Sequence, residues 1–217
     1  RRRLNKKRYE DYLEIQKLWL QNEVARWQDA QRYGREEQNR LYDLVQRETQ
    51  SQLRQINALA SQLREAPADT PQRRKLLLHI LVLATYVKRR KDMTISADRS
   101  SVLLVSRLSS ALRESCSNLS LSGISGNLYL PETEAVLPIG TAFAAYDLFE
   151  DALELALDTL TYFLVTVTAE QKALTLRVNL ECAADFSPLT QRWPGVTLEQ
   201  DEDTWFLTKT LAGGEDA

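Results

Sequence analysis

The stretch that decides the fold is GTAFAAYDLFEDALELALDTLTYFLVTVTAEQKALTLRVNLE, residues 140–181. Its first part, residues 140–160, is rich in Ala, Leu and Glu and predicts one strong helix. Its second part alternates apolar and polar residues in two runs, residues 161–170 and 173–181. The polar residues EQK join these runs, which is the pattern of an antiparallel β-hairpin.

The flanking segments extend this pattern. Residues 100–119 predict a helix, residues 126–131 a strand that leaves a glycine turn, and residues 203–211 a final strand. Helices and strands in this order indicate an α+β fold, in which helices lie on one face of a mixed sheet.

The first half of the chain is helical in character. Residues 4–64 contain no proline and one glycine, Gly34. A single helix of that length is not stable alone in water, so it must pack against a copy of itself or another helix. Prolines in residues 65–72 predict a turn, and a second helix is expected from about residue 71 to residue 92. Two such hairpins would form a four-helix bundle in a dimer. The residues expected at the dimer contact are Leu53, Ile56, Leu63, Leu81 and Val82.

Charge separates two regions, which we expect to be two domains. Residues 1–99 hold 22 Lys and Arg against 13 Asp and Glu, whereas residues 100–217 hold 6 against 17. The basic start, RRRLNKKR, suits the inner flank of a membrane helix, so an upstream membrane segment is expected; a solvated helix start is the alternative. The longest apolar run, residues 76–87, is too short to cross a bilayer. The basic run KRRK, residues 88–91, suits a helix C-terminus better than a nucleic-acid site.

Candidate reactive side chains are few. Cys116 and Cys182 lack the spacing of a metal site, and this favours a reduced, cytoplasmic setting. His79 stands inside LLLHILVL and is expected to be a buried, hydrogen-bonded histidine; a displaced phosphate acceptor is the alternative. Asp151 and Glu154 would be surface acids or, alternatively, an acid–base pair. No metal site is predicted.

Residues 40–46, RLYDLVQ, resemble the motif R-[IL]-H-D-x-[LV] of bacterial sensor histidine kinases, in which the histidine accepts phosphate. Arg40, Leu41 and Asp43 match that motif. Tyr42 occupies the position of the histidine, with Asp43 following it, so the resemblance implies that no acceptor is present.

Residues 146–160, YDLFEDALELALDTL, resemble the nucleotide-binding helix Y-R-I-L-Q-E-A-L-T-N-A-L-K-H-A of the same family. Asp151 occupies the position of the glutamate. Leu155 replaces the asparagine that offers an oxygen to Mg²⁺, and a leucine has no lone pair for a hard cation. Asp158 and Thr159 replace the lysine and histidine. The following glycine-rich motif is absent from NLECAADFSPLTQ, residues 179–191, and a long ATP lid is missing.

The chain therefore resembles the cytoplasmic region of a degenerate sensor histidine kinase. The resemblance implies a linker helix and dimerisation hairpin in residues 1–99 and a degenerate GHKL ATPase-like α/β sandwich in residues 100–217. It implies a non-catalytic signal-transduction module, without cofactor or catalytic residue, attached to the inner membrane through a missing sensor segment. Expected partners are a second copy and a partner kinase or response regulator, with no nucleic acid. The alternatives are a divergent active histidine kinase or response-regulator phosphatase, or a coiled-coil adaptor of another fold.

Overall fold

The computed structural model describes residues 39–40, 43, 46–47, 49–97, 102–133, 135–170 and 173–212. The chain divides into two compact units, Arg1–Gln46 and Arg47–Ala217, and the elements below belong to the second unit. Most of the long helix expected over residues 4–64 lies outside the described residues, as do Gly34 and Tyr42.

Two helices form the expected hairpin. Helix α2 is Gln50–Glu65 and helix α3 is Pro71–Ala97. The Thr70 hydroxyl accepts a hydrogen bond from the backbone N–H of Arg73, 3.2 Å away, and so caps the start of α3. The Arg73 guanidinium donates to the carbonyl of Leu63 at the end of α2, 2.8 Å away. Helix α3 extends to Ala97, past residue 92 where the sequence predicted its end, and Met93 and Thr94 in this added turn are buried.

A five-stranded mixed sheet forms the other side of the unit. Its order is β2-β4-β5-β7-β6, with bounds Ser125–Tyr129, Tyr162–Glu170, Ala173–Glu181, Thr204–Ala212 and Thr197–Asp201 respectively. Strand β2 is parallel to β4, and the other neighbours are antiparallel. The expected hairpin is β4–β5, and its register places Val165 opposite Val178 and Val167 opposite Leu176. These four side chains are buried, so one face of the hairpin belongs to the core.

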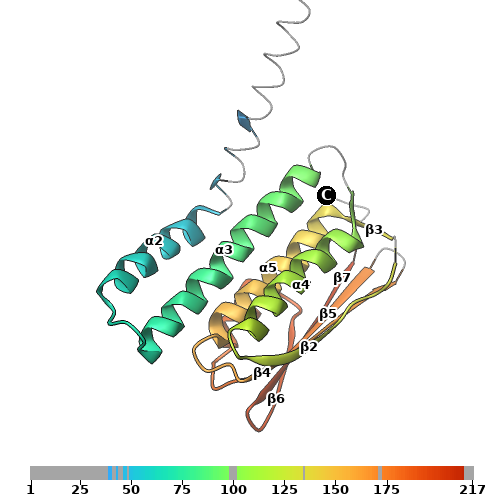
Figure 1. Cartoon of the computed structure of the whole chain (residues 1–217). Coiled ribbons are helices and arrows are strands. Elements are labelled where there is room, and N and C mark those ends of the chain that lie inside the picture. Colours follow the sequence, from blue (N-terminus) through green and yellow to red (C-terminus); the bar gives the residue numbers. More distant parts are fainter. Residues whose placement is uncertain are drawn as a thin grey trace, which may run out of the picture. The chain divides into compact units, whose positions relative to one another are not determined.

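The helices lie in layers against this sheet (Figure 1). Helix α4, Val105–Leu121, and helix α5, Ile139–Ala156, cover one face of the sheet, and α3 packs on their outer side. Two short strands, β1 (Val102–Leu104) and β3 (Val136–Pro138), pair antiparallel beside the start of α4. A short helix, α6 (Ser187–Arg192), connects β5 to β6. The fold is α+β, as the sequence predicted.

Helix α3 shares its core with the α/β part. Val82, Tyr86 and Met93 of α3 are buried in the same hydrophobic cluster as Leu112 of α4 and Phe149 of α5. The boundary expected near residue 99 therefore does not coincide with a break in the packing, and the two-domain division stays a prediction. Val82 is only 3% exposed within a single chain and is not available to a second copy, in contrast to what the sequence suggested.

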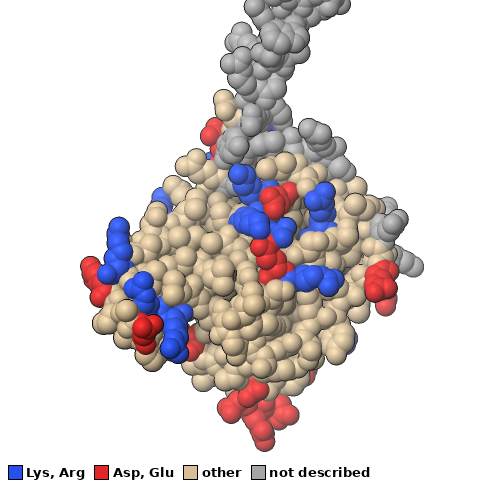
Figure 2. Space-filling view, in the orientation of Figure 1, with Lys and Arg blue, Asp and Glu red and all other residues tan. Residues whose placement is uncertain are grey.

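Charged residues are distributed unevenly over the surface (Figure 2). Acidic side chains gather at the tip of the β6–β7 hairpin, where Glu199, Asp201, Glu202 and Asp203 are exposed. Basic and acidic side chains alternate over the helical layers. Among the helices that the structure describes, none has the length and apolarity needed to cross a membrane.

Candidate functional site

Helix α5 carries the positions that resemble a nucleotide-binding motif. Its inner face is anchored by Ala145, Tyr146, Phe149 and Leu153, all of which are at most 1% exposed. Asp151 and Leu155 are four residues apart and therefore lie on one face of the helix. The turn after the helix carries Asp158 and Thr159. The sequence predicted a helix over residues 140–160, which is correct for Asp151 and Leu155, but α5 ends at Ala156, so Asp158 and Thr159 lie in a turn and not in the helix.

Asp151 is held by the segment that follows β5. Trp193 Nε1 donates a hydrogen bond to Asp151 Oδ2, 2.7 Å away, and Arg192 Nη1 lies 2.9 Å from Asp151 Oδ1. Burial raises the pKa of Asp151, whereas the bond from Trp193 and the charge of Arg192 act in the opposite direction. Asp151 is therefore a structural anchor for the end of α6, and both of its oxygens already have partners.

The side chains at the neighbouring motif positions Asp158 and Thr159 also contact other residues of the chain. Thr159 Oγ1 accepts a hydrogen bond from the backbone N–H of Ala183, 3.0 Å away, in the stretch where a glycine-rich motif was expected. Asp158 Oδ1 lies 3.2 Å from His79 Nε2, which joins the end of α5 to α3. Leu155 is 37% exposed and offers no ligand atom.

These residues are not suited to bind Mg²⁺ and a nucleoside triphosphate. The asparagine oxygen is absent at Leu155, and the acid at Asp151 is engaged by Trp193 and Arg192. A negative charge at Asp158 opposes a polyanion. Within the described parts of the chain, no group of three or more His, Cys, Asp or Glu side chains could hold a metal ion.

Other residues singled out in the sequence lie outside α5. Tyr42 lies outside the described residues, and Asp43 is helical and exposed. His79 is hydrogen-bonded as expected, but its side chain is 27% exposed, so it is not a core histidine. Both cysteines are free and buried, and burial raises the pKa of Cys116 to about 12, which leaves it a neutral thiol.

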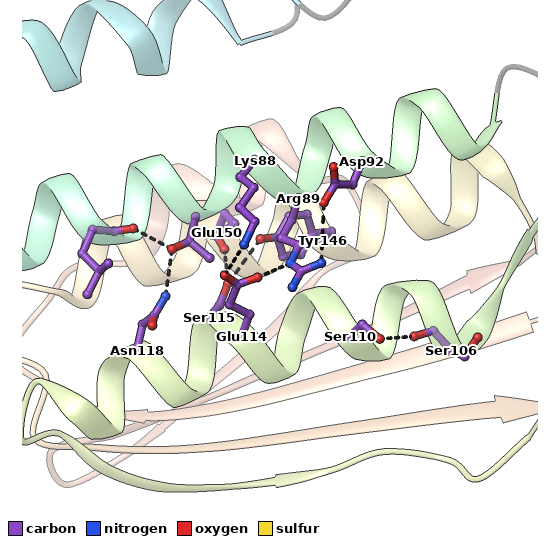
Figure 3. Close-up of polar contacts among 12 residues, drawn as sticks. Lys88, Arg89, Asp92, Ser106, Ser110, Glu114, Ser115, Asn118, Tyr146 and Glu150 are labelled. Atoms are coloured by element: carbon purple, nitrogen blue, oxygen red, sulfur yellow. Dashed lines mark hydrogen bonds and ion pairs between the residues drawn. The ribbon is translucent and has the colours of Figure 1, made fainter.

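A buried polar cluster between α4 and α5 was not predicted from the sequence (Figure 3). Ser115 donates to Glu150 Oε1, 2.9 Å away, and its hydroxyl lies 3.2 Å from that of Tyr146. Glu150 is 2% exposed, and its Oε2 has no hydrogen-bond partner among the described residues. Burial raises the pKa of Glu150 to about 8, even though the bonds from Ser115 and Tyr146 lower it. Glu150 is therefore mostly protonated near neutral pH.

Polar contacts also hold α3 against α4 and α5. Lys88 and Arg89 both bind the carboxylate of Glu114 on α4 (Figure 3). Tyr86 donates to Asp147 Oδ1 of α5, 3.0 Å away, and Arg90 Nε lies 3.2 Å from the same oxygen. The basic run of residues 88–91 therefore contributes to helix packing, in addition to any effect on a helix end.

One further bond lies nearer the middle of α3. Asn118 of α4 donates to the Thr85 hydroxyl, 2.8 Å away. The contact between α3 and α4 is thus specified by hydrogen bonds and ion pairs as well as by apolar packing.

No protein-family model matches the sequence, and no curated protein matches it. Among solved structures, the chain is similar to the histidine kinase AdeS of Acinetobacter baumannii, with 9% identity and a TM-score of 0.40, over 77% of this chain and 98% of that chain. It is also similar to a bacterial phosphotransferase, with 8% identity and a TM-score of 0.40, over 76% of this chain and 90% of that one.

Proposed function

We propose that this chain is a non-catalytic signal-transduction module that acts through dimerisation and protein–protein contacts. The observation that carries the proposal is the engagement of Asp151. Its two oxygens are bound by Trp193 and Arg192, at 2.7 and 2.9 Å, at the position where the resembling motif has a nucleotide-site glutamate. A nucleotide would have to displace both partners and still lack the metal-binding oxygen at Leu155.

The scaffold around this position supports the same proposal. The segment from Cys182 to Val196 connects β5 to β6 and includes only the six-residue helix α6, in place of a long lid. Thr159 binds the backbone of this segment, so the end of α5 and the connection after β5 are tied together.

The helical hairpin supports dimerisation. Helix α2 is amphipathic, yet none of its residues is buried in the single chain. Leu53, Leu77 and Leu81 of α2 and α3 are between 37% and 47% exposed. Leu77, Leu78 and Leu81 also line a hollow of about 440 Å³, together with Arg74, Lys75 and Ser122. A second hairpin would bury these leucines.

In this proposal, an upstream membrane sensor moves the helices of residues 1–99. The contacts from Lys88, Arg89 and Arg90 to α4 and α5 carry the movement into the α/β part. A response regulator or a partner kinase reads the altered surface.

The first test is Mg-ATP titration of the purified 217-residue chain by calorimetry. We expect no saturable heat from folded protein, with near-ultraviolet circular dichroism confirming the fold. Micromolar binding of Mg-ATP, or transfer of its phosphate to the chain, would overturn the non-catalytic assignment.

The second test concerns the dimer and uses analytical ultracentrifugation. Wild type is expected to sediment as a dimer, and Leu53→Glu as a monomer because it places a charge in the contact between hairpins. The control is Tyr129→Glu, since Tyr129 is 60% exposed on β2 and does not line the hollow beside Leu77 and Leu81. A wild-type monomer, or equal behaviour of the two variants, would refute dimerisation through this face.

A further inference from the structure

A hollow lies between the first half of α4 and the end of β2, apart from the motif positions on α5. Its volume is about 460 Å³. One wall is formed by Ser106, Ser109, Ser110 and Arg113 of α4, and the other by the consecutive residues 128–133. Volumes of this order hold a few side chains or one small ligand.

The second wall belongs to an edge of the main sheet. Strand β2 is the terminal strand in the order β2-β4-β5-β7-β6, and among the described residues no strand pairs with its outer side. Figure 1 shows β2 as the outermost strand on the side of α4. After Tyr129 the chain continues through residues 130–133 outside any helix or strand. An edge of this kind presents unpaired N–H and C=O groups that can bind another strand.

The wall formed by α4 is polar, and one of its hydroxyl groups has no hydrogen-bond partner among the described residues. Ser106, Ser110 and Arg113 follow each other at steps of four and three residues and so share one face of α4. Ser110 donates to the Ser106 carbonyl, 2.8 Å away (Figure 3). Ser109 is 9% exposed, yet its hydroxyl has no hydrogen-bond partner among the described residues. A buried hydroxyl without a partner is costly unless a ligand satisfies it.

The two walls carry opposite charges that do not pair with each other. Within the described residues, Arg113 on α4 and Glu132 on the segment after β2 form no ion pair, although both line the hollow. An occupant with an acidic group towards Arg113 and a basic group towards Glu132 would complement both charges.

We propose that the free edge of β2 binds an extended peptide strand of a partner protein. Alternate side chains of a strand beside β2 point towards α4, because successive side chains of a strand point to opposite faces. One of these side chains is acidic; it pairs with Arg113 and accepts a hydrogen bond from Ser109. The main-chain bonds supply affinity, and the α4 wall supplies specificity. The residues involved differ from those behind the nucleotide argument, so either conclusion can fail without the other.

The test begins with a random library of displayed nine-residue peptides, selected on the immobilised 217-residue chain. Enriched peptides are expected to lack proline and to share an acidic residue at one position. A fluorescein-labelled copy of the best peptide is then titrated with the chain by fluorescence anisotropy. Absence of enriched peptides would overturn the proposal.

Main-chain recognition is tested with two N-methylated copies of this peptide, each methylated on alternate amides. Only alternate N–H groups of an added strand face the edge, so one copy is expected to bind and the other to lose binding. Equal binding of both copies would exclude strand addition and leave recognition of side chains alone.

The role of the α4 wall is tested with matched charge reversals. Arg113→Glu is expected to weaken binding of the acidic peptide at least tenfold, whereas Arg107→Glu, an exposed position on the same helix that does not line the hollow, changes it less than twofold. Ser109→Ala is expected to weaken binding severalfold. Circular dichroism confirms that each variant is folded, and equal effects of the two reversals would refute this site.

Discussion

Replacing Glu150 by glutamine is expected to change how the stability of the chain depends on pH. Glutamine has the shape of a protonated glutamate, so it keeps the contact with Ser115 but cannot ionise. Near pH 6 the folded protein already holds Glu150 protonated, because its pKa is raised to about 8. In the unfolded chain, however, Glu150 is ionised at pH 6, so wild type and Glu150→Gln are expected to have similar free energies of unfolding only near pH 4, and Glu150→Gln is expected to be the more stable protein at pH 6.

The magnitude follows from proton linkage. The ordinary value for Glu150 is 4.5 and the folded value is about 8, so the folded state binds more protons than the unfolded state between them. Stability from this group is present in full below the unfolded value and is lost as pH rises through the folded value. At about 1.4 kcal/mol per unit, wild type loses about 2 kcal/mol between pH 6 and pH 8 from this group alone. Glu150→Gln does not lose it.

The assay is urea unfolding followed by circular dichroism at pH 6 and pH 8 for both proteins. The readout is the difference between the two pH values, which removes groups common to wild type and variant. Glu199→Gln, at an exposed position of β6, is the control and should differ from wild type equally at both pH values. If wild type and Glu150→Gln show the same pH dependence, Glu150 is not held protonated and the reasoning is wrong.

Three further predictions concern stability. Trp193→Phe keeps an aromatic ring but removes the donor to Asp151, and thermal unfolding is expected to show a loss of about 1 kcal/mol; an unchanged midpoint would mean that this bond contributes nothing. Gly126→Ala is expected to destabilise the chain by about 1–3 kcal/mol, because the added Cβ would lie 2.4 Å from atoms of Phe163. Gly140→Ala, in a helix and with no atom within 4 Å of the added Cβ, should instead stabilise it by about 0.5–1 kcal/mol, and a loss in denaturant midpoint there would contradict the prediction.

The main helices and the central hairpin could be predicted from sequence because their signals are local. The alternation in residues 161–181 fixes which side chains of β4 and β5 face the core, and the structure confirms it. Strands β1 and β3 have three residues each and α6 has six, so each contains fewer than two periods of its pattern, too few for the pattern to be recognised in the sequence. Elements this short are defined by their neighbours, and the sequence did not predict them.

The partners of the candidate site were less accessible to sequence reasoning. The motif resemblance located Asp151, but its partner Trp193 lies 42 residues further along the chain, and no local pattern links the two. The burial of Glu150 likewise depends on α4 covering α5 in the folded chain. One signal was present: in a helix whose inner face is apolar, Glu150 follows Tyr146 by four residues and therefore shares its side.

The shared carboxylate of Glu114 has a consequence for sequence change. Lys88 and Arg89 both bind it, so replacement of either cation leaves Glu114 paired with the other. Replacement of Glu114 leaves two cations without this acid at once. Among homologous sequences, positions 88 and 89 should therefore vary independently of each other. A substitution of Glu114 should be found only in sequences in which positions 88 and 89 have both changed. Substitutions at these three positions are therefore expected to be coupled: position 114 is constrained, whereas either cation at position 88 or 89 can compensate for loss of the other.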